Sequence, residues 1–143
     1  MTAAIPLSGA LRAAIVLDGE LTPGVAANVA ACIAAGLGAT LPALAGRPLV
    51  DADGFPSASS AHLPIAILRS AAAALSALVE HARAPDGGAV VVFPSFAQRI
   101  HTVEAYWREH ALRSMRTEAM LGIGLVGPAS WVRSLTGSLS LFR

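Results

Sequence analysis

The segment Leu121–Phe142 (LGIGLVGPASWVRSLTGSLSLF) decides the fold of this chain. The run from Met120 to Val126 is apolar and uncharged, which predicts a buried strand. Two glycines inside this run would allow a helix or another backbone to approach the strand closely. Pro128 suits the start of a short helix, and Thr136-Gly137 is expected to end it. The chain therefore closes with a buried strand and a short helix.

Strand and helix signals alternate along the rest of the chain. Short apolar runs predict strands at 12–17, 62–68 and 89–93. The segment 49–54 predicts a short strand that ends in an Asx and glycine turn, and a polar loop follows at 56–61. The run at 89–93 is apolar throughout, which is typical of a strand buried on both faces. A helix is predicted over 22–37, where Gly36 and Gly38 are expected to end it. A second helix is expected after Ser70, which would cap it, and a third over 95–111, because a capping-box pattern begins at Ser95.

This order of elements predicts the fold class α/β. We expect one three-layer α/β/α domain over residues 1–143, with a mixed, mostly parallel sheet of four to five strands. A chain of this length can bury a core without a disulfide or a metal site.

The charged residues are few and of an unusual kind. Only 13% of residues are charged and the net charge is +1, and all ten basic residues are arginine. Lysine-based catalysis is therefore excluded within this chain. Nucleic-acid binders usually carry a basic stripe, so we do not expect a nucleic-acid partner. Arg108, Arg113 and Arg116, on one predicted helix, form either an anion site or a solvated helix face.

The stretch from Leu21 to Ala45 contains no charged residue, which raises the question of a membrane span. It consists mainly of small residues and includes Asn28, Thr40 and Pro42, so its transfer hydrophobicity is weak. We expect a buried helix followed by a break, and no membrane partner. The N-terminus lacks the basic region of a secretory signal.

Cofactor signatures are weak in this sequence. The lone Cys32 rules out an intrachain disulfide and a multi-cysteine zinc site, and a reducing cytoplasm is the expected compartment. The four histidines lack the spacing of a zinc helix. Gly122–Gly127 matches the letters G-x-G-x-x-G, but no acidic residue follows Glu118. No metal, nucleotide or other cofactor is expected.

Polar residues follow two of the predicted strands, where ligand sites form in open α/β sheets. Asp18 and Asn28 come after the first strand, and Ser95, Gln98 and His101 come after the run at 89–93. We interpret Asn28, Ser95, Gln98 and His101 as candidate ligand-binding residues.

Simpler interpretations exist for several of these side chains. Asn28 would equally be satisfied by neighbouring backbone or water. Ser95 is either a helix cap or a nucleophile beside His101. Cys32 is either a small buried apolar residue or a reactive thiol.

The opening strand, the helix Gly24–Ala35 and the block Leu121–Phe142 resemble the peptidyl-tRNA hydrolase II family. In that family a glycine-punctuated strand leads through Gly-Pro and a short helix to Thr-Gly-x-Leu-x-Leu. The resemblance implies an α/β/α fold and a homodimer. Most of the chain is also similar to a bacterial domain of unknown function (DUF2000) related to that hydrolase. This similarity is carried by Pro23–Asn28, Leu63–Leu68, Ala97-Gln98 and the C-terminal block.

The catalytic residues of the hydrolase are not matched in this chain. Where the family reads Gly-Lys-Ile-Ala-Ala-Gln-Cys-Ala-His, Gly24 matches the glycine, but Val25 stands at the lysine and Cys32 at the histidine. The Asp-Ala-Gly loop of the family would fall near 94–97, where Ser95 is present and no acidic residue occurs. The resemblance therefore implies the fold without peptidyl-tRNA hydrolysis.

Three function classes follow. The first is a small-ligand or peptide binding module, regulatory in role, with a pocket near Asn28, Gln98 and His101. The second is a hydrolase-like enzyme with altered chemistry, in which His101 is the base and Ser95 or a water is the nucleophile. The third is a dimeric interaction protein whose apolar surface is buried against its partner. We favour binding over catalysis because the expected catalytic groups are absent.

Overall fold

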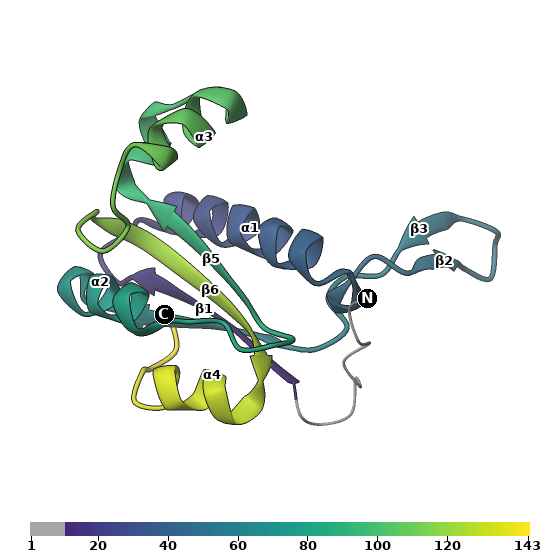
Figure 1. The fold of residues 1–143 in the computed structure, drawn as a ribbon. Helices are drawn as coiled ribbons and strands as arrows, with labels where there is room; N and C mark the ends of the chain where they lie inside the picture. Colours follow the sequence, from purple (N-terminus) through teal and green to yellow (C-terminus); the bar gives the residue numbers. More distant parts are fainter. Residues whose placement is uncertain (1–10) are drawn as a thin grey trace.

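The computed structural model describes residues 11–143 and has a four-stranded mixed sheet at its centre, in the order β4-β1-β6-β5 (Figure 1). The strands are β1 (Leu11–Asp18), β4 (Ile65–Ser70), β5 (Ala89–Pro94) and β6 (Met120–Pro128). β1 pairs in parallel with β4, whereas β6 runs antiparallel to both β1 and β5. The sheet is mixed, as predicted. Three of the strands, β4, β1 and β5, run in the same direction and β6 runs in the opposite one, so only the pairing of β1 with β4 is parallel.

Helices cover both faces of the sheet and produce three layers (Figure 1). They are α1 (Pro23–Thr40), α2 (Ala72–His81), α3 (Val103–Ala111) and α4 (Ala129–Thr136). α1 packs Val29, Ile33 and Leu37 against one face, and α2 and α4 pack against the other. α3 has no buried residue and stands away from the sheet beyond the end of β5 (Figure 1).

The glycines of β6 allow α1 to lie close to the sheet. A Cβ at Gly122 would stand 2.8 Å from Ile33 Cδ1, and a Cβ at Gly124 would overlap Ile33 Cγ2. The predicted close approach of a helix to this strand is therefore confirmed. Because these glycines lie within a strand, they do not form the phosphate-binding turn of a dinucleotide site.

The strand β5 is an edge strand, contrary to the prediction that it is buried on both faces. Among the described residues its backbone pairs only with β6, and Val90, Val91, Val92 and Phe93 are all partly exposed. Its apolar pattern is that of an interior strand, so periodicity alone could not distinguish the two positions.

The polar loop predicted at 56–61 is partly a strand. β2 (Pro48–Val50) and β3 (Pro56–Ala58) pair as an antiparallel hairpin outside the main sheet. Asp51 Oδ1 accepts hydrogen bonds from the backbone N–H groups of Asp53 and Phe55, and Gly54 has a φ of 85°. The predicted Asx and glycine turn is confirmed, and it is what brings the two short segments together.

The first helix is longer than predicted. α1 continues through Gly36 and Gly38 and ends at Thr40, just before Pro42. A Cβ at Gly36 would stand 3.1 Å from Val91 Cγ1, so this glycine serves helix packing against β5 rather than helix termination. Tertiary packing outweighs the modest cost of a glycine inside a helix.

Two predicted helix starts are also wrong in detail. Ser70 does not cap α2, because its hydroxyl donates to the carbonyl of Ala71, which is the N-cap residue. The helix predicted over 95–111 is two helices, the short 3-10 helix η2 (Ser95–Arg99) and α3. The cap of α3 is Thr102, whose side chain accepts a hydrogen bond from Ala105 N. The capping box expected at Ser95 is absent.

α1 has the length and composition of a membrane span, with a mean hydropathy of 1.4 over 18 residues. Its buried residues, Ala26, Val29, Ile33 and Leu37, recur every three or four positions and pack on the sheet. One face of the helix therefore packs on the sheet, but only 22% of the helix is buried, so the expectation of a buried helix holds for that face alone. The expectation about a secretory signal concerns the N-terminal residues and lies outside the described ones.

Candidate functional site

A cavity of about 770 Å³ lies where α1, β5, η2 and α3 meet, and we call it the α1–α3 groove. α1, β5 and the segment from η2 into α3 all contribute lining residues. Its lining is Asn28, Cys32, Ile33, Gly36, Val91, Val92, Phe93, Ala97, Gln98, Ile100, His101, Thr102, Val103, Tyr106 and Trp107.

The groove contains three of the predicted ligand-binding residues. Asn28 comes from α1, Gln98 from η2, and His101 from the link between η2 and α3, and all three are exposed side chains. Ser95 does not line the groove, and its backbone N–H donates to Ala119 O at 2.8 Å. Asp18 lies elsewhere, in a cavity of about 470 Å³ beside the ends of β1 and β4.

The spacing of the α1 residues explains why they meet in the groove. Asn28, Cys32 and Gly36 are four positions apart, so they lie on one side of the helix, next to the face that packs on the sheet. Cys32 was expected to be buried against the sheet, but it is exposed and lines the groove. This spacing is visible in the sequence and could have added Cys32 to the candidate residues.

Aromatic side chains of α3 were not predicted as part of the site. Trp107 is 63% exposed and Val103 is 49% exposed, and both line the groove. Tyr106 also lines it, and burial raises the pKa of the Tyr106 phenol above its ordinary value. Its ring lies 5.8 Å from that of Phe96, which is buried. These residues were missed because the sequence does not show that α3 stands away from the sheet.

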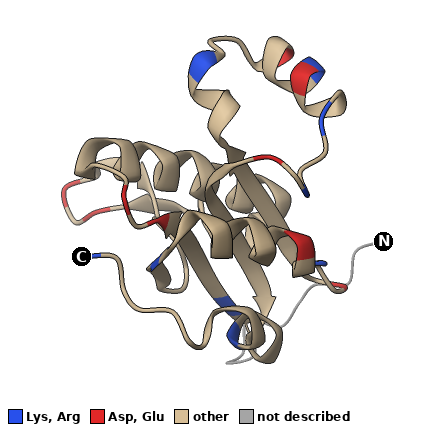
Figure 2. Cartoon of the chain, turned by 90° about the vertical axis from the view of Figure 1, so that its left-hand side faces the viewer, with Lys and Arg blue, Asp and Glu red and all other residues tan. Residues whose placement is uncertain are grey.

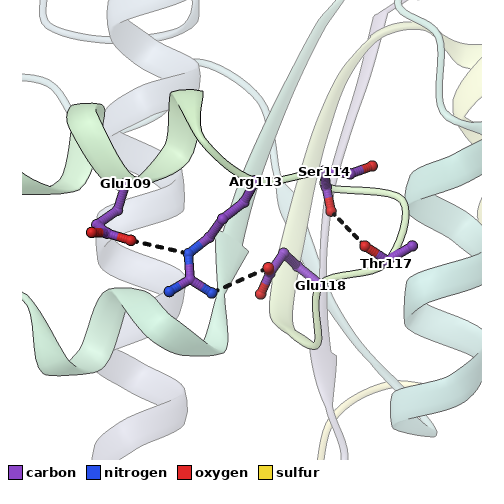
Figure 3. Close-up of polar contacts among 5 residues, drawn as sticks. All are labelled: Glu109, Arg113, Ser114, Thr117 and Glu118. Atoms are coloured by element: carbon purple, nitrogen blue, oxygen red, sulfur yellow. Dashed lines mark hydrogen bonds and ion pairs between the residues drawn. The ribbon is translucent and has the colours of Figure 1, made fainter.

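Arg113 attaches the end of α3 to the start of β6 (Figure 3). Its Nε donates to Glu109 Oε2 at 3.3 Å, its Nη1 donates to Glu118 Oε1 at 3.2 Å, and its guanidinium lies 4.3 Å from the centre of the Phe96 ring. Hydrogen bonding to Glu118 is the main cause of a raised pKa of Arg113. The predicted helical cluster is only partly right, since Arg113 and Arg116 follow α3 rather than belong to it.

A second cavity of about 300 Å³ lies next to the groove, and Ile100 lines both. Arg99, Arg108 and Arg113 contribute its cationic side chains, and Glu109, which binds Arg113, contributes a carboxylate. Charges of both signs gather around α3 (Figure 2). Among residues 11–143, Arg99 and Arg108 make no ion pair with a carboxylate.

The comparison with protein families decides the membership of this chain. The model of the family described as protein of unknown function (DUF2000) matches residues 11–143. The chain belongs to the DUF2000 family. The fold of this DUF2000 chain is similar to that of the protein of unknown function Atu0240 from Agrobacterium tumefaciens strain C58, with a TM-score of 0.80 and 19% identity over 93% of this chain and 98% of the other. A search of curated proteins found no match.

The DUF2000 groove presents hydrogen-bonding groups without formal charge. None of its lining residues is Asp, Glu, Lys or Arg, and its polar groups are amides, a hydroxyl, an imidazole, a thiol, a phenol and an indole N–H. Within the described residues, no three His, Cys, Asp or Glu side chains lie close enough to hold a metal ion. An apolar cavity with a few polar groups suits the binding and orientation of an uncharged ligand.

Proposed function

We propose that this DUF2000 protein is a binding module whose α1–α3 groove holds an uncharged ligand, either a small molecule or a peptide segment. The observation that carries the proposal is that Asn28, Gln98 and His101, from three separate segments, line one largely apolar cavity. The amides of Asn28 and Gln98 both donate and accept hydrogen bonds, and would orient the ligand. Trp107 and Tyr106 offer aromatic surface to its apolar part.

The fold is proposed to be related to that of peptidyl-tRNA hydrolase II, without its reaction. Val25 stands where that family has its lysine, and Ser95 lies near the position of its aspartate. An RNA substrate is held largely by cations on its phosphates, and the groove has none. The proposed ligand is therefore not peptidyl-tRNA.

The alternative of an altered hydrolase is less well supported. Ser95, its candidate nucleophile, does not line the groove with His101. Cys32 does line it, so a thiol and an imidazole share one cavity. This alternative predicts hydrolysis of p-nitrophenyl acetate that is lost both in Cys32→Ser and in His101→Ala. Equal rates in the parent and these variants would exclude it.

The binding proposal is tested by thermal-shift screening against uncharged heteroaromatic compounds and capped short peptides. A ligand at a hundred times its Kd stabilises the folded state by about 2.7 kcal/mol. Loss of one hydrogen bond in Asn28→Ala or His101→Ala is expected to weaken binding about two- to tenfold.

His81→Ala is the matched control for His101→Ala, since His81 is an exposed histidine on α2, away from the groove. It should leave the affinity unchanged. A ligand whose affinity is equal in parent, Asn28→Ala and His101→Ala does not bind in the groove. If every ligand found behaves in that way, or if none is found, the proposal is wrong.

A further inference from the structure

The two edges of the main sheet differ in whether another segment of the chain covers them. The edge formed by β4 is covered by the C-terminal segment, through hydrogen bonds from Arg69 N to Ser140 O and from Phe142 N to Ile67 O, both at 2.9 Å. At the other edge, within residues 11–143, the backbone of β5 is hydrogen-bonded only to β6. One row of backbone donors and acceptors of β5 therefore has no partner among residues 11–143.

The α1–α3 groove reaches this free row. Val91 and Phe93 pack with the core on the α1 face of the sheet, whereas Val92 packs with the core on the opposite face. All three line the groove. Successive side chains of a strand point to opposite faces, so a lining that includes residues of both sets is the one expected for a cavity at the edge between them.

Along Ala89–Phe93 the edge also lacks the features that usually prevent pairing, which begin at Pro94, the last residue of β5. Charged side chains, bulges and prolines keep most natural edge strands from adding another strand. Ala89–Phe93 carries no charge and no proline, and the irregularity in its pairing comes only after Phe93. This stretch is about as long as an average strand, so it is a complete surface for strand addition.

We propose that β5 accepts an extended peptide segment of a partner protein, which lies in the α1–α3 groove as a fifth strand, with an acidic residue at one flank. This inference rests on the proposed binding function and specifies its ligand. Main-chain hydrogen bonds to β5 would provide affinity, and alternate side chains would enter the groove and provide specificity. A peptide main chain is uncharged, which fits the uncharged lining.

The acidic flank follows from the charges beside the groove. Arg99 and Arg108 line the adjoining cavity, are exposed, and make no ion pair with a carboxylate of residues 11–143. Glu109 makes its ion pair with Arg113 rather than with Arg99 or Arg108. A peptide that leaves the end of β5 passes from the groove toward this cavity, where an Asp or Glu side chain would bind an arginine.

The test uses a displayed library of random dodecapeptides selected on the full chain. The expected consensus alternates apolar residues and contains an Asp or Glu at one end. Two methylated versions of the consensus peptide are then synthesised. One carries N-methyl groups on the odd-numbered amides and the other carries them on the even-numbered amides. Because only alternate amides of a strand face its neighbour, one version should bind at least about tenfold more weakly, and the other should bind as the parent peptide does.

Protein variants test the acidic flank. Arg99→Glu and Arg108→Glu should each weaken binding several-fold, and the replacement of the peptide's acid by lysine should restore it. Arg116→Glu is the matched control, since Arg116 is exposed but lines neither cavity. Amide hydrogen exchange at Val90–Phe93 should slow when the peptide binds.

Three results would overturn the inference. The first is that selection on the full chain enriches no peptide sequence. The second is that the two methylated peptides bind with equal affinity. In that second case, sensitivity to Asn28→Ala and His101→Ala would preserve the proposed binding function while excluding strand addition. The third is protection of Val90–Phe93 in the unliganded protein that rises with protein concentration, because a second copy would then occupy the edge.

Discussion

Gly124 of β6 lies directly against Ile33 of α1, with no room for a methyl group between them. A Cβ at Gly124 would overlap Ile33 Cγ2 and stand 3.1 Å from Leu37 Cδ1, and all of these atoms belong to the buried core. The distance between the long helix and the sheet, and hence the position of the groove beside them, depends on this contact.

Gly124→Ala is expected to lower the free energy of unfolding by about 1–3 kcal/mol, because overpacking a well-packed core costs that amount. Chemical denaturation measures it. Ile33→Ala removes the side chain that the new methyl group would meet. The double variant should therefore be more stable than the sum of the two single changes predicts, and strict additivity would show that Gly124 is not in contact with Ile33.

Two glycines of α1 form a second test, because both lie in the helix but only one contacts the sheet. Nothing lies within 4 Å of a Cβ at Gly38, whereas a Cβ at Gly36 would stand 3.1 Å and 3.2 Å from the two Val91 methyl groups. Gly38→Ala should stabilise the protein by up to about 1 kcal/mol. Gly36→Ala should be about 1 kcal/mol less stable than Gly38→Ala, since the contact offsets the helix propensity.

Equal melting temperatures for these two variants would show that α1 does not pack on β5 at Gly36. The comparison is informative for function as well, because Gly36 and Val91 both line the groove.

The cap of α3 supplies a third prediction. Thr102 accepts a hydrogen bond from Ala105 N at 3.3 Å, whereas Thr22, at the same position of α1, makes no side-chain cap bond. Thr102→Ala should destabilise α3 by about 0.5–2 kcal/mol. Thr22→Ala should cost less. Hydrogen exchange of the α3 amides measures the first effect, and unchanged exchange in Thr102→Ala would contradict it.

The single tyrosine of the chain supplies a pH prediction. Burial raises the pKa of Tyr106 above the ordinary value of 10.0. The unfolded chain therefore loses the phenolic proton at a lower pH than the folded one, so the free energy of unfolding should fall as pH rises above 10.0. Ultraviolet absorbance of the phenolate follows Tyr106 alone.

Tyr106→Phe should reduce this alkaline loss of stability, and a ligand in the groove should delay ionisation of Tyr106 further, since it would bury the phenol more deeply. A phenol that titrates at the same pH in the folded and the urea-unfolded chain would contradict the prediction.

Much of the fold was predictable because its signals are local. The apolar runs 120–126 and 62–68 predicted β6 and β4, and the position of Pro128 predicted the start of α4. Several errors concern helix ends. Gly36, Ser70 and Ser95 carry strong local signals for a helix stop or cap, but packing of α1 on β5 and the break before Thr102 outweigh them.

Some residues of the candidate site were predicted from the sequence and others were not. Asn28, Gln98 and His101 were selected because polar groups after strands gather at one end of a sheet, and they do line one cavity. Ser95 was selected by the same argument and lies outside that lining. Trp107 was not selected, since its exposure follows from the placement of α3 away from the sheet.

The sequence by itself determined the family, the alternation of strands and helices, and the absence of lysine chemistry, because these depend on residue type and short-range order. Only the tertiary structure decided which strand lies at the free edge. The run Ala89–Phe93 has the composition of an interior strand, yet the order β4-β1-β6-β5 leaves it with a neighbour on one side only. Strand order is set by contacts between segments far apart in the chain, so no local pattern encodes it.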